Sequence, residues 1–253
     1  MIISLGGETM KKALISSLMI LVFIVPALKG YAGQQNPAPK AYLLVLETMD
    51  YNSTLRKGIQ YFFSDVLKKG DSLLLWTSQR LYNLSKYSVA GMNKQVIDKT
   101  IAVIKKDTEL NKQIWNRDRN KRALKDIKDT YEKKILKCTE ILKNFKGKKN
   151  IVMMYQIRYG YDYSESFTKY SQPVKVGDQY KMTFNEAPVI EALKSSGANF
   201  HFLYLDFKKG RPNANNSYDV EKVYKNLAKE SNGFYLTTKK PLTFFKKMLE
   251  AIQ

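Results

Sequence analysis

The chain has 253 residues, of which 44% are hydrophobic, and its formal net charge is +20. The length and apolar content are sufficient for one sizeable core, although two small domains would also fit. The only cysteine, Cys138, excludes an internal disulfide, so the fold must depend on its core. Lysine supplies most of the positive charge, which argues against a nucleic-acid-binding protein because such proteins favour arginine clusters with interleaved aromatic residues.

The first 32 residues have the pattern of a secretory signal peptide. Lys11 and Lys12 precede an apolar run over residues 13–25, and Gly30 and Ala32 supply small residues at positions −3 and −1 of a cleavage site. We therefore expect residues 1–32 to be removed and the mature protein to be secreted or periplasmic. An uncleaved membrane anchor is the alternative, but the 16 residues from 13 to 28 fall short of the roughly 20 that span a bilayer.

The rest of the chain alternates between two hydrophobic patterns after a proline-containing linker at residues 33–40. Apolar runs predict strands at residues 42–47, 71–78, 150–157, 199–207 and 234–238, and a weaker alternation predicts an edge strand at 81–88. Apolar residues three or four positions apart predict helices at residues 54–69, 93–106, 122–146, 187–196, 218–231 and 242–252. Ser53 is the predicted N-cap of the first helix, residues 105–121 form a polar stretch, and residues 175–184 form a hairpin around Gly177 and Asp178.

Alternating strands and helices of this kind predict a doubly wound α/β domain over residues 41–253. Strands with continuous apolar runs are buried on both faces, so we expect a mostly parallel central sheet with helices on both sides. The edge strand at residues 81–88 is expected to pair antiparallel with the strand before it. In such a sheet, ligands bind at the loops that leave the carboxyl ends of the central strands.

Several segments resemble the von Willebrand factor A-type (VWA) domain, including the VWA-related domains of exported bacterial proteins. The segments are Lys69-Gly70-Asp71 before the strand LLLWTS, the stretch EALKSSGANFHFLYLD, and the closing stretch LAKESNGFYLTTKKPLTFFKKMLEAI. The resemblance covers residues 41–252. It implies the α/β architecture described above and a protein that binds partners through loops at the carboxyl ends of its strands.

The metal-ion-dependent adhesion site of that family is degenerate in this sequence. The family has an Asp-x-Ser-x-Ser loop after its first strand, whereas this chain has Glu47-Thr48-Met49-Asp50-Tyr51. Tyr155-Gln156 replaces the usual Thr-Asp pair, and a methionine thioether is a poor ligand for Mg²⁺. We therefore expect no metal and no cofactor. A shifted site made by Asp50, Asn52 and Ser53 is one alternative, and a metal-free Asx turn with an N-cap is the other.

Two polar stretches supply the candidate binding residues. Asp50 and Asn52 would make polar contacts and Arg158 a charge-assisted one, while Tyr51, Tyr159 and Tyr161 would supply contact area. The expected partner is a protein or a cell surface, and we expect no enzyme and no nucleic acid. The tyrosine-rich stretch at residues 155–170 has a second interpretation, a loop packed back on the sheet.

Two further functional hypotheses remain open. Residues 1–32 contain Lys11, Lys12, Lys29 and Glu8, so the chain without them has a formal net charge of +18. A surface with this charge would bind a polyanion such as an anionic lipid or a wall polymer. The alternative is that the lysines are only solvated side chains on exposed helix faces. A hydrolase that uses Glu47 is a third hypothesis. His201, the only histidine, and Cys138 both fall in apolar patterns and are expected to be packed side chains.

Overall fold

The computed structural model describes residues 38–48, 51–118, 131–156, 172–176, 179–205 and 220–252. The helices and strands in these ranges belong to a compact unit, Pro39–Gln253. Its central sheet consists of six strands in the described ranges: β1 Lys40–Glu47, β2 Ser72–Trp76, β3 Leu81–Asn83, β4 Lys148–Gln156, β7 Ala198–Leu205 and β8 Tyr235–Thr237. The order is β3-β2-β1-β4-β7-β8, with β3 antiparallel to β2 and every other neighbouring pair parallel.

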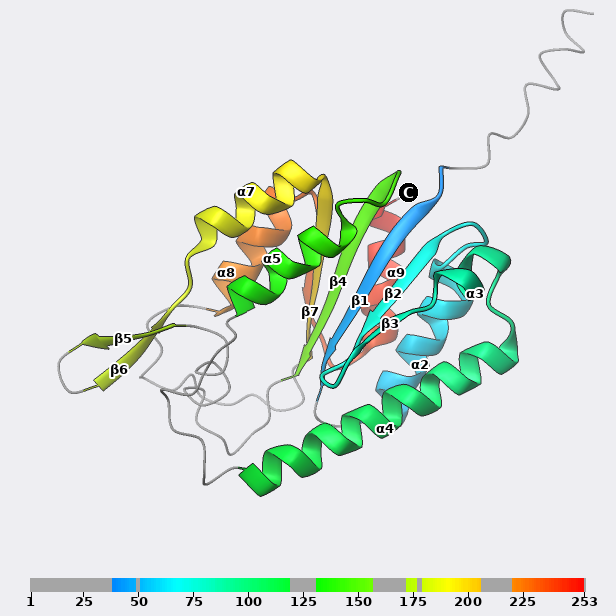
Figure 1. Ribbon diagram of the computed structural model, residues 1–253, viewed down its shortest axis with the longest axis horizontal. Helices are drawn as coiled ribbons and strands as arrows, with labels where there is room; N and C mark the ends of the chain where they lie inside the picture. Colours follow the sequence, from blue (N-terminus) through cyan, green and yellow to red (C-terminus); the bar gives the residue numbers. More distant parts are fainter. Residues whose placement is uncertain are drawn as a thin grey trace, which may run out of the picture. The chain divides into compact units, whose positions relative to one another are not determined.

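Helices cover both faces of this sheet (Figure 1). One face packs against α2 Ser53–Tyr61, the π-helical turn Phe62–Val66, α4 Lys94–Asp118 and α9 Pro241–Ile252, and the other packs against α5 Tyr131–Leu142, α7 Glu186–Ser196 and α8 Val220–Glu230. The short α3 Ser85–Ala90 follows β3, and β5 Gln172–Val176 pairs with β6 Gln179–Thr183 as a separate antiparallel hairpin. The doubly wound α/β fold with an antiparallel edge strand and the predicted hairpin are both confirmed.

The core consists of two hydrophobic clusters, one on each side of the sheet. In β1, Leu43 and Val45 face the α5 side, whereas Leu44 and Leu46 face the α2 side. Side chains alternate between the faces of a strand, so a strand covered on both faces has apolar residues at consecutive positions. This explains why the central strands appear as unbroken apolar runs in the sequence.

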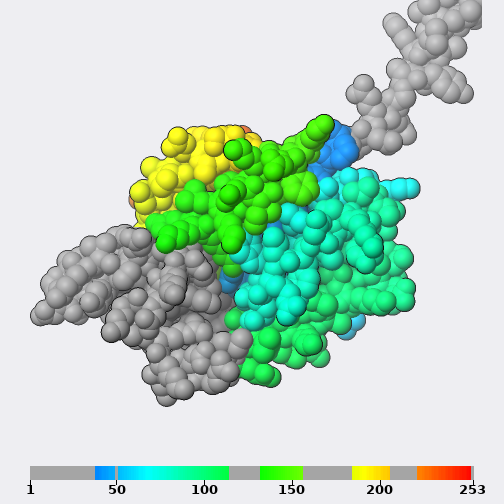
Figure 2. Space-filling model, in the orientation of Figure 1, coloured from blue at the N-terminus to red at the C-terminus, as the bar shows by residue number. Residues whose placement is uncertain are grey.

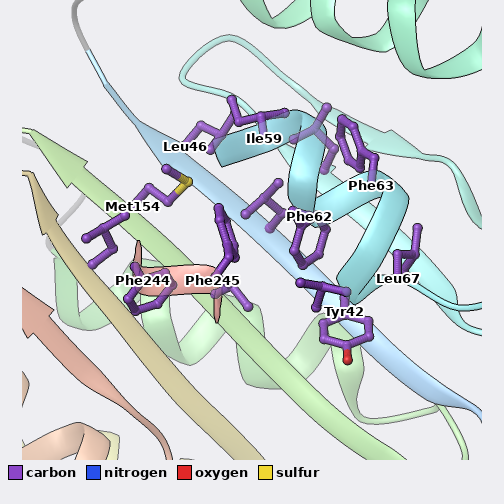
Figure 3. Packing of buried hydrophobic residues seen from close by; sticks show 14 of the residues in the cluster. Tyr42, Leu46, Ile59, Phe62, Phe63, Leu67, Met154, Phe244 and Phe245 are labelled. Carbon is purple, nitrogen blue, oxygen red and sulfur yellow. The ribbon is translucent and has the colours of Figure 1, made fainter. Parts of the chain in front are cut away.

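Aromatic side chains from β1, the π-helical turn and α9 lie together in the cluster on the α2 side (Figure 3). Phe62 packs edge-on against Tyr42 at a ring-centroid distance of 5.5 Å and lies 5.1 Å from Phe245 of α9. Phe62 begins the π-helical turn, whose Leu67 amide donates to the Phe62 carbonyl oxygen five residues earlier. The adjacent Phe62 and Phe63 of this turn both lie in the cluster, as do the adjacent Phe244 and Phe245 of α9.

Several predicted boundaries are wrong, and the helix predicted over residues 122–146 ends at Leu142. The segment predicted as an edge strand at residues 81–88 is a strand only over Leu81–Asn83, because the backbone then forms α3. The helix predicted to end at residue 106 continues to Asp118, through much of the predicted polar stretch. Asp107 and Thr108 are both 5% exposed and extend the buried face of α4 beyond Ile104. A search for apolar periodicity missed this extension because these buried side chains are polar.

Candidate interaction site at the carboxyl edge of the sheet

The carboxyl edge of the sheet, where β1, β2, β4, β7 and β8 end, contains a topological switch point between β1 and β4. The helix after β1 packs on one face of the sheet, whereas α7, which precedes β7, packs on the other (Figure 1). β1 and β4 are neighbours throughout their length, and Glu47 at the end of β1 is in register with Tyr155 of β4. Loops that leave such a pair of strands diverge, and ligands of open α/β sheets bind between them.

The loop after β1 is held against the domain by its own side chains. Thr48 is 1% exposed, and half-buried Tyr51 packs against the α2-side cluster. Among the described residues, neither hydroxyl has a hydrogen-bond partner. Burial raises the pKa of Tyr51, and the positive charge of Arg56 opposes this effect. Tyr51 therefore gives the loop a fixed apolar contact and stays protonated at neutral pH.

Asn52, and not Ser53 as predicted, is the N-cap of α2. Its Oδ1 accepts a hydrogen bond of 2.8 Å from the Leu55 amide, and its backbone is extended. A side chain at this position satisfies an amide that has no partner within the helix. Ser and Asn are both good caps, so the sequence identified the turn but placed its cap one residue too late.

A buried ion pair lies at the end of β1. Lys134 of α5 pairs with Glu47, and the two side chains are only 11% and 7% exposed. The Nζ of Lys134 is also 4.9 Å from the ring centroid of Trp76, at the end of β2, and the Nζ of Lys137 is 5.7 Å from the same ring. The ammonium group of α5 thus contacts both a carboxylate at the end of β1 and an indole ring at the end of β2.

A divalent cation does not fit this group of side chains. The ammonium group of Lys134 already contacts the carboxylate of Glu47, the residue expected from the sequence to replace the first Asp of the adhesion motif, and would repel a second cation. Within the described ranges, no group of three or more His, Cys, Asp or Glu side chains could hold a metal ion. Asn52, one ligand of the proposed shifted site, uses its Oδ1 to cap α2.

A second polar group fixes the turn between β2 and β3. Asp107 of α4 accepts hydrogen bonds from the hydroxyl groups of Thr77, at 2.7 Å, and Tyr82, at 2.8 Å. Burial, together with this hydrogen bond to the Asp107 carboxylate, raises the pKa of Tyr82 to about 12. Asp107 therefore joins the outer hairpin of the sheet to the helix that crosses its carboxyl edge.

The sequence located part of this site and missed part of it. Tyr51 and Asn52 lie on the loop where they were expected, whereas Asp50, Arg158, Tyr159 and Tyr161 lie outside the described residues. Sequence analysis missed Lys134, Trp76 and Asp107, which belong to elements far apart in the chain. For Lys134 and Asp107, the only available signal in the sequence was a charged residue close to the apolar face of a helix.

The only histidine and the only cysteine are packed side chains, as expected. His201 is fully buried, and its Nε2 lies 3.2 Å from Oδ1 of Asn150 on the neighbouring strand. Burial, with a smaller effect from Lys148, lowers the pKa of His201 to about 3. Burial also raises the pKa of Cys138 to about 12, so its thiol stays protonated and unreactive at neutral pH.

Comparisons with known proteins identify similarity in fold only. No protein-family model matches the sequence, and curated proteins give no significant match. An aerotolerance-related membrane protein from Bacteroides fragilis aligns with a TM-score of 0.43 and 12% identity, covering 85% of this chain and 98% of that chain. The TFIIH p34 N-terminal domain aligns with a TM-score of 0.38 and 8% identity over 83% of this chain and 96% of that one. Human COPII-coat protein Sec24c aligns with a TM-score of 0.41 and 8% identity, covering 82% of this chain and 30% of that chain.

None of the helices within the described ranges is long and apolar enough to cross a membrane.

Proposed function

We propose that this chain is an exported VWA-like interaction module that binds a protein or cell-surface partner without a divalent metal. The loops at the carboxyl edge of the sheet would form the contact. The observation that carries the proposal is the ion pair of Glu47 with Lys134 at the switch point, because the ammonium group supplies the positive charge that a metal would otherwise provide. The proposal concerns binding and includes no catalytic step.

The candidate contact residues follow the two strands of the switch point. Tyr51 and Asn52 lie on the loop after β1, and Asp50 belongs to the same loop. Arg158, Tyr159 and Tyr161 come two, three and five positions after the end of β4 in the sequence and lie outside the described residues. Two loops that diverge from neighbouring strands can contact one partner from both sides.

Site-specific photocrosslinking tests the binding role. A benzoylphenylalanine introduced at Tyr51 in the full chain is compared with one introduced at Lys225, an exposed position on α8. We expect one discrete crosslinked product from position 51, unchanged by EDTA and lost when Arg158 and Tyr159 are replaced by Ala. The same product from both positions, or a product that disappears in EDTA, would contradict the proposal.

Export is tested separately by the mass of the purified protein. Cleavage after Ala32 makes Gly33 the first residue of the mature chain. A product that retains residues 1–32 and remains in the membrane fraction would support the anchor alternative instead.

A further inference from the structure

The amino edge of the sheet, opposite the candidate interaction site, is rich in lysine. β1, β2 and β4 begin here, and α7 and α8 end here before β7 and β8 (Figure 1). The exposed members of this lysine rim are Lys68, Lys69, Lys143, Lys146, Lys148, Lys194 and Lys229, and Lys40 and Lys149 are half-buried. At the surface, the start of β1 lies between the junction of α5 with β4 and the segment before β2 (Figure 2).

The carboxylates nearest to these lysines are mostly engaged within the protein. Asp71 is 5% exposed and accepts hydrogen bonds from the backbone amides of Lys40 and Lys68 at 2.8 and 2.9 Å. Glu230 pairs with Lys194 at 2.6 Å. Exposed Asp65, Glu140 and Glu250 lie near the ends of helices at this edge, but the lysines outnumber all of these acidic residues. The described part of the amino edge therefore has a net positive charge.

Helix-end electrostatics account for only some of the lysines. Lys194 and Lys229 lie in the last turns of α7 and α8, where a cation interacts favourably with the helix dipole. Lys68 and Lys69 lie in the turn before β2, and Lys146 in the turn before β4, outside any helix. These turn lysines are exposed and lie beyond the last turn of the preceding helices.

Exposed apolar side chains accompany the turn lysines. Tyr87 and Val89 of α3 are 41% and 46% exposed. The carbonyl oxygen of Val89 accepts a hydrogen bond of 3.1 Å from the amide of Gly70, next to Lys69, and the Nζ of Lys86 lies 5.3 Å from the Tyr87 ring centroid. An aromatic and an aliphatic side chain among lysines are typical of a surface that enters the headgroup region of a bilayer.

The chain also enters the domain at this edge. Ala38 and Pro39 are exposed and lead directly into β1. The apolar run at residues 13–25 is therefore joined through a short segment to the same edge that carries the lysine rim.

We propose that the amino edge of the sheet docks on an anionic lipid bilayer. The lysines of the rim contact the phosphate headgroups, and Tyr87 and Val89 enter the interface. This orientation leaves the carboxyl edge directed away from the membrane. The proposal does not depend on the function proposed for that edge.

A fluorescent reporter on the full chain tests the proposal. Val89→Cys is labelled with an NBD dye, which does not react with Cys138 because that thiol is buried and protonated. The expected result is a several-fold rise in emission with phosphatidylglycerol vesicles, no rise with phosphatidylcholine vesicles, and loss of the signal in 0.5 M salt. A matched label at Leu110→Cys, on an exposed position of α4, stays unchanged.

Charge variants identify the surface that binds. The triple variant Lys68→Gln, Lys69→Gln and Lys146→Gln should need on the order of a hundredfold more anionic lipid for half-maximal emission. The control triple variant Lys106→Gln, Lys225→Gln and Lys247→Gln removes the same charge from exposed helix positions and should change this value only a few-fold. All variants keep the amino-terminal segment, so differences between them report on the rim.

Three outcomes would overturn the proposal. The first is an equal response from the labels at positions 89 and 110. The second is a rim variant that binds as tightly as the control variant. The third combines two results: soluble polyphosphate binds tightly and in a salt-sensitive way and prevents vesicle binding, and the label at position 89 never responds to lipid. This combination would indicate a general polyanion site.

Discussion

The two ends of the central strands bury polar side chains in different ways. At the carboxyl edge, Glu47 and Lys134 form an ion pair, with the lysine reaching the strand end from α5. In the amino half of the same sheet, Asn150 and His201 form a neutral pair, and both are fully buried. A charged pair close to solvent keeps part of its hydration, whereas charge in the strand interior would have to be fully desolvated. The comparison indicates that this fold buries a charged pair at the carboxyl edge of the sheet and a neutral pair in the strand interior. The following substitutions test this difference.

The largest expected effect comes from breaking the charged pair on one side only. Lys134→Met should lower the free energy of unfolding by about 3–4 kcal/mol, because it leaves the Glu47 carboxylate buried without its cation. Replacing both partners, with Lys134→Met and Glu47→Leu, should recover most of the loss. Urea denaturation measures each value. Lys137→Met, at an exposed position beside the same indole ring, should change stability by less than about 0.5 kcal/mol.

The neutral pair should become unstable in acid. The pKa of His201 in the folded protein is about 3, below the value of 6.5 expected in the unfolded chain. The unfolded chain therefore binds more protons, and the contribution of His201 is complete above pH 6.5 and falls as the pH drops toward 3. Between pH 6.5 and 5 we expect wild type to lose about 2 kcal/mol more than His201→Gln, measured by urea denaturation at each pH. Equal losses would show that His201 is protonated within the fold.

A smaller effect is expected where one carboxylate accepts two hydroxyl groups. Tyr82→Phe should lower stability by about 1.5 kcal/mol, because Asp107 loses one of its two charge-assisted hydrogen bonds. Tyr87→Phe removes an exposed hydroxyl and should change stability by less than about 0.5 kcal/mol. Thermal melting of the two variants gives the comparison. A loss of similar size in both would show that the bond to Asp107 adds nothing.

The smallest effect concerns the loop after β1. Asn52→Ala should cost about 1 kcal/mol, because the Leu55 amide at the start of α2 loses its acceptor. Ser53→Ala, at the position that the sequence favoured as the cap, should stay within about 0.5 kcal/mol of wild type. The reverse order in urea denaturation would mean that the serine is the cap in solution.

Sequence analysis succeeded where a structural element depends on its own residues. The strand over Lys40–Glu47 and the helix over Pro241–Ile252 were predicted from local hydrophobic patterns to within two residues at each end. It failed at the end of α4, where the residues that continue the buried face are Asp107 and Thr108. The burial of the Asp107 carboxylate is compensated by hydrogen bonds from Thr77 and Tyr82, and those partners belong to the hairpin of β2 and β3.

The candidate site divides in the same way. The sequence alone determined that a polar loop follows the first buried strand, and it predicts that the adhesion motif of the resembling family has lost its serines. Only the tertiary structure decided that Lys134 lies against Glu47, and that the turn lysines lie along a single edge. The physical reason is that a hydrophobic period is set by neighbours along the chain, whereas an ion pair or a charged surface is made by residues that meet only when parallel strands align their ends.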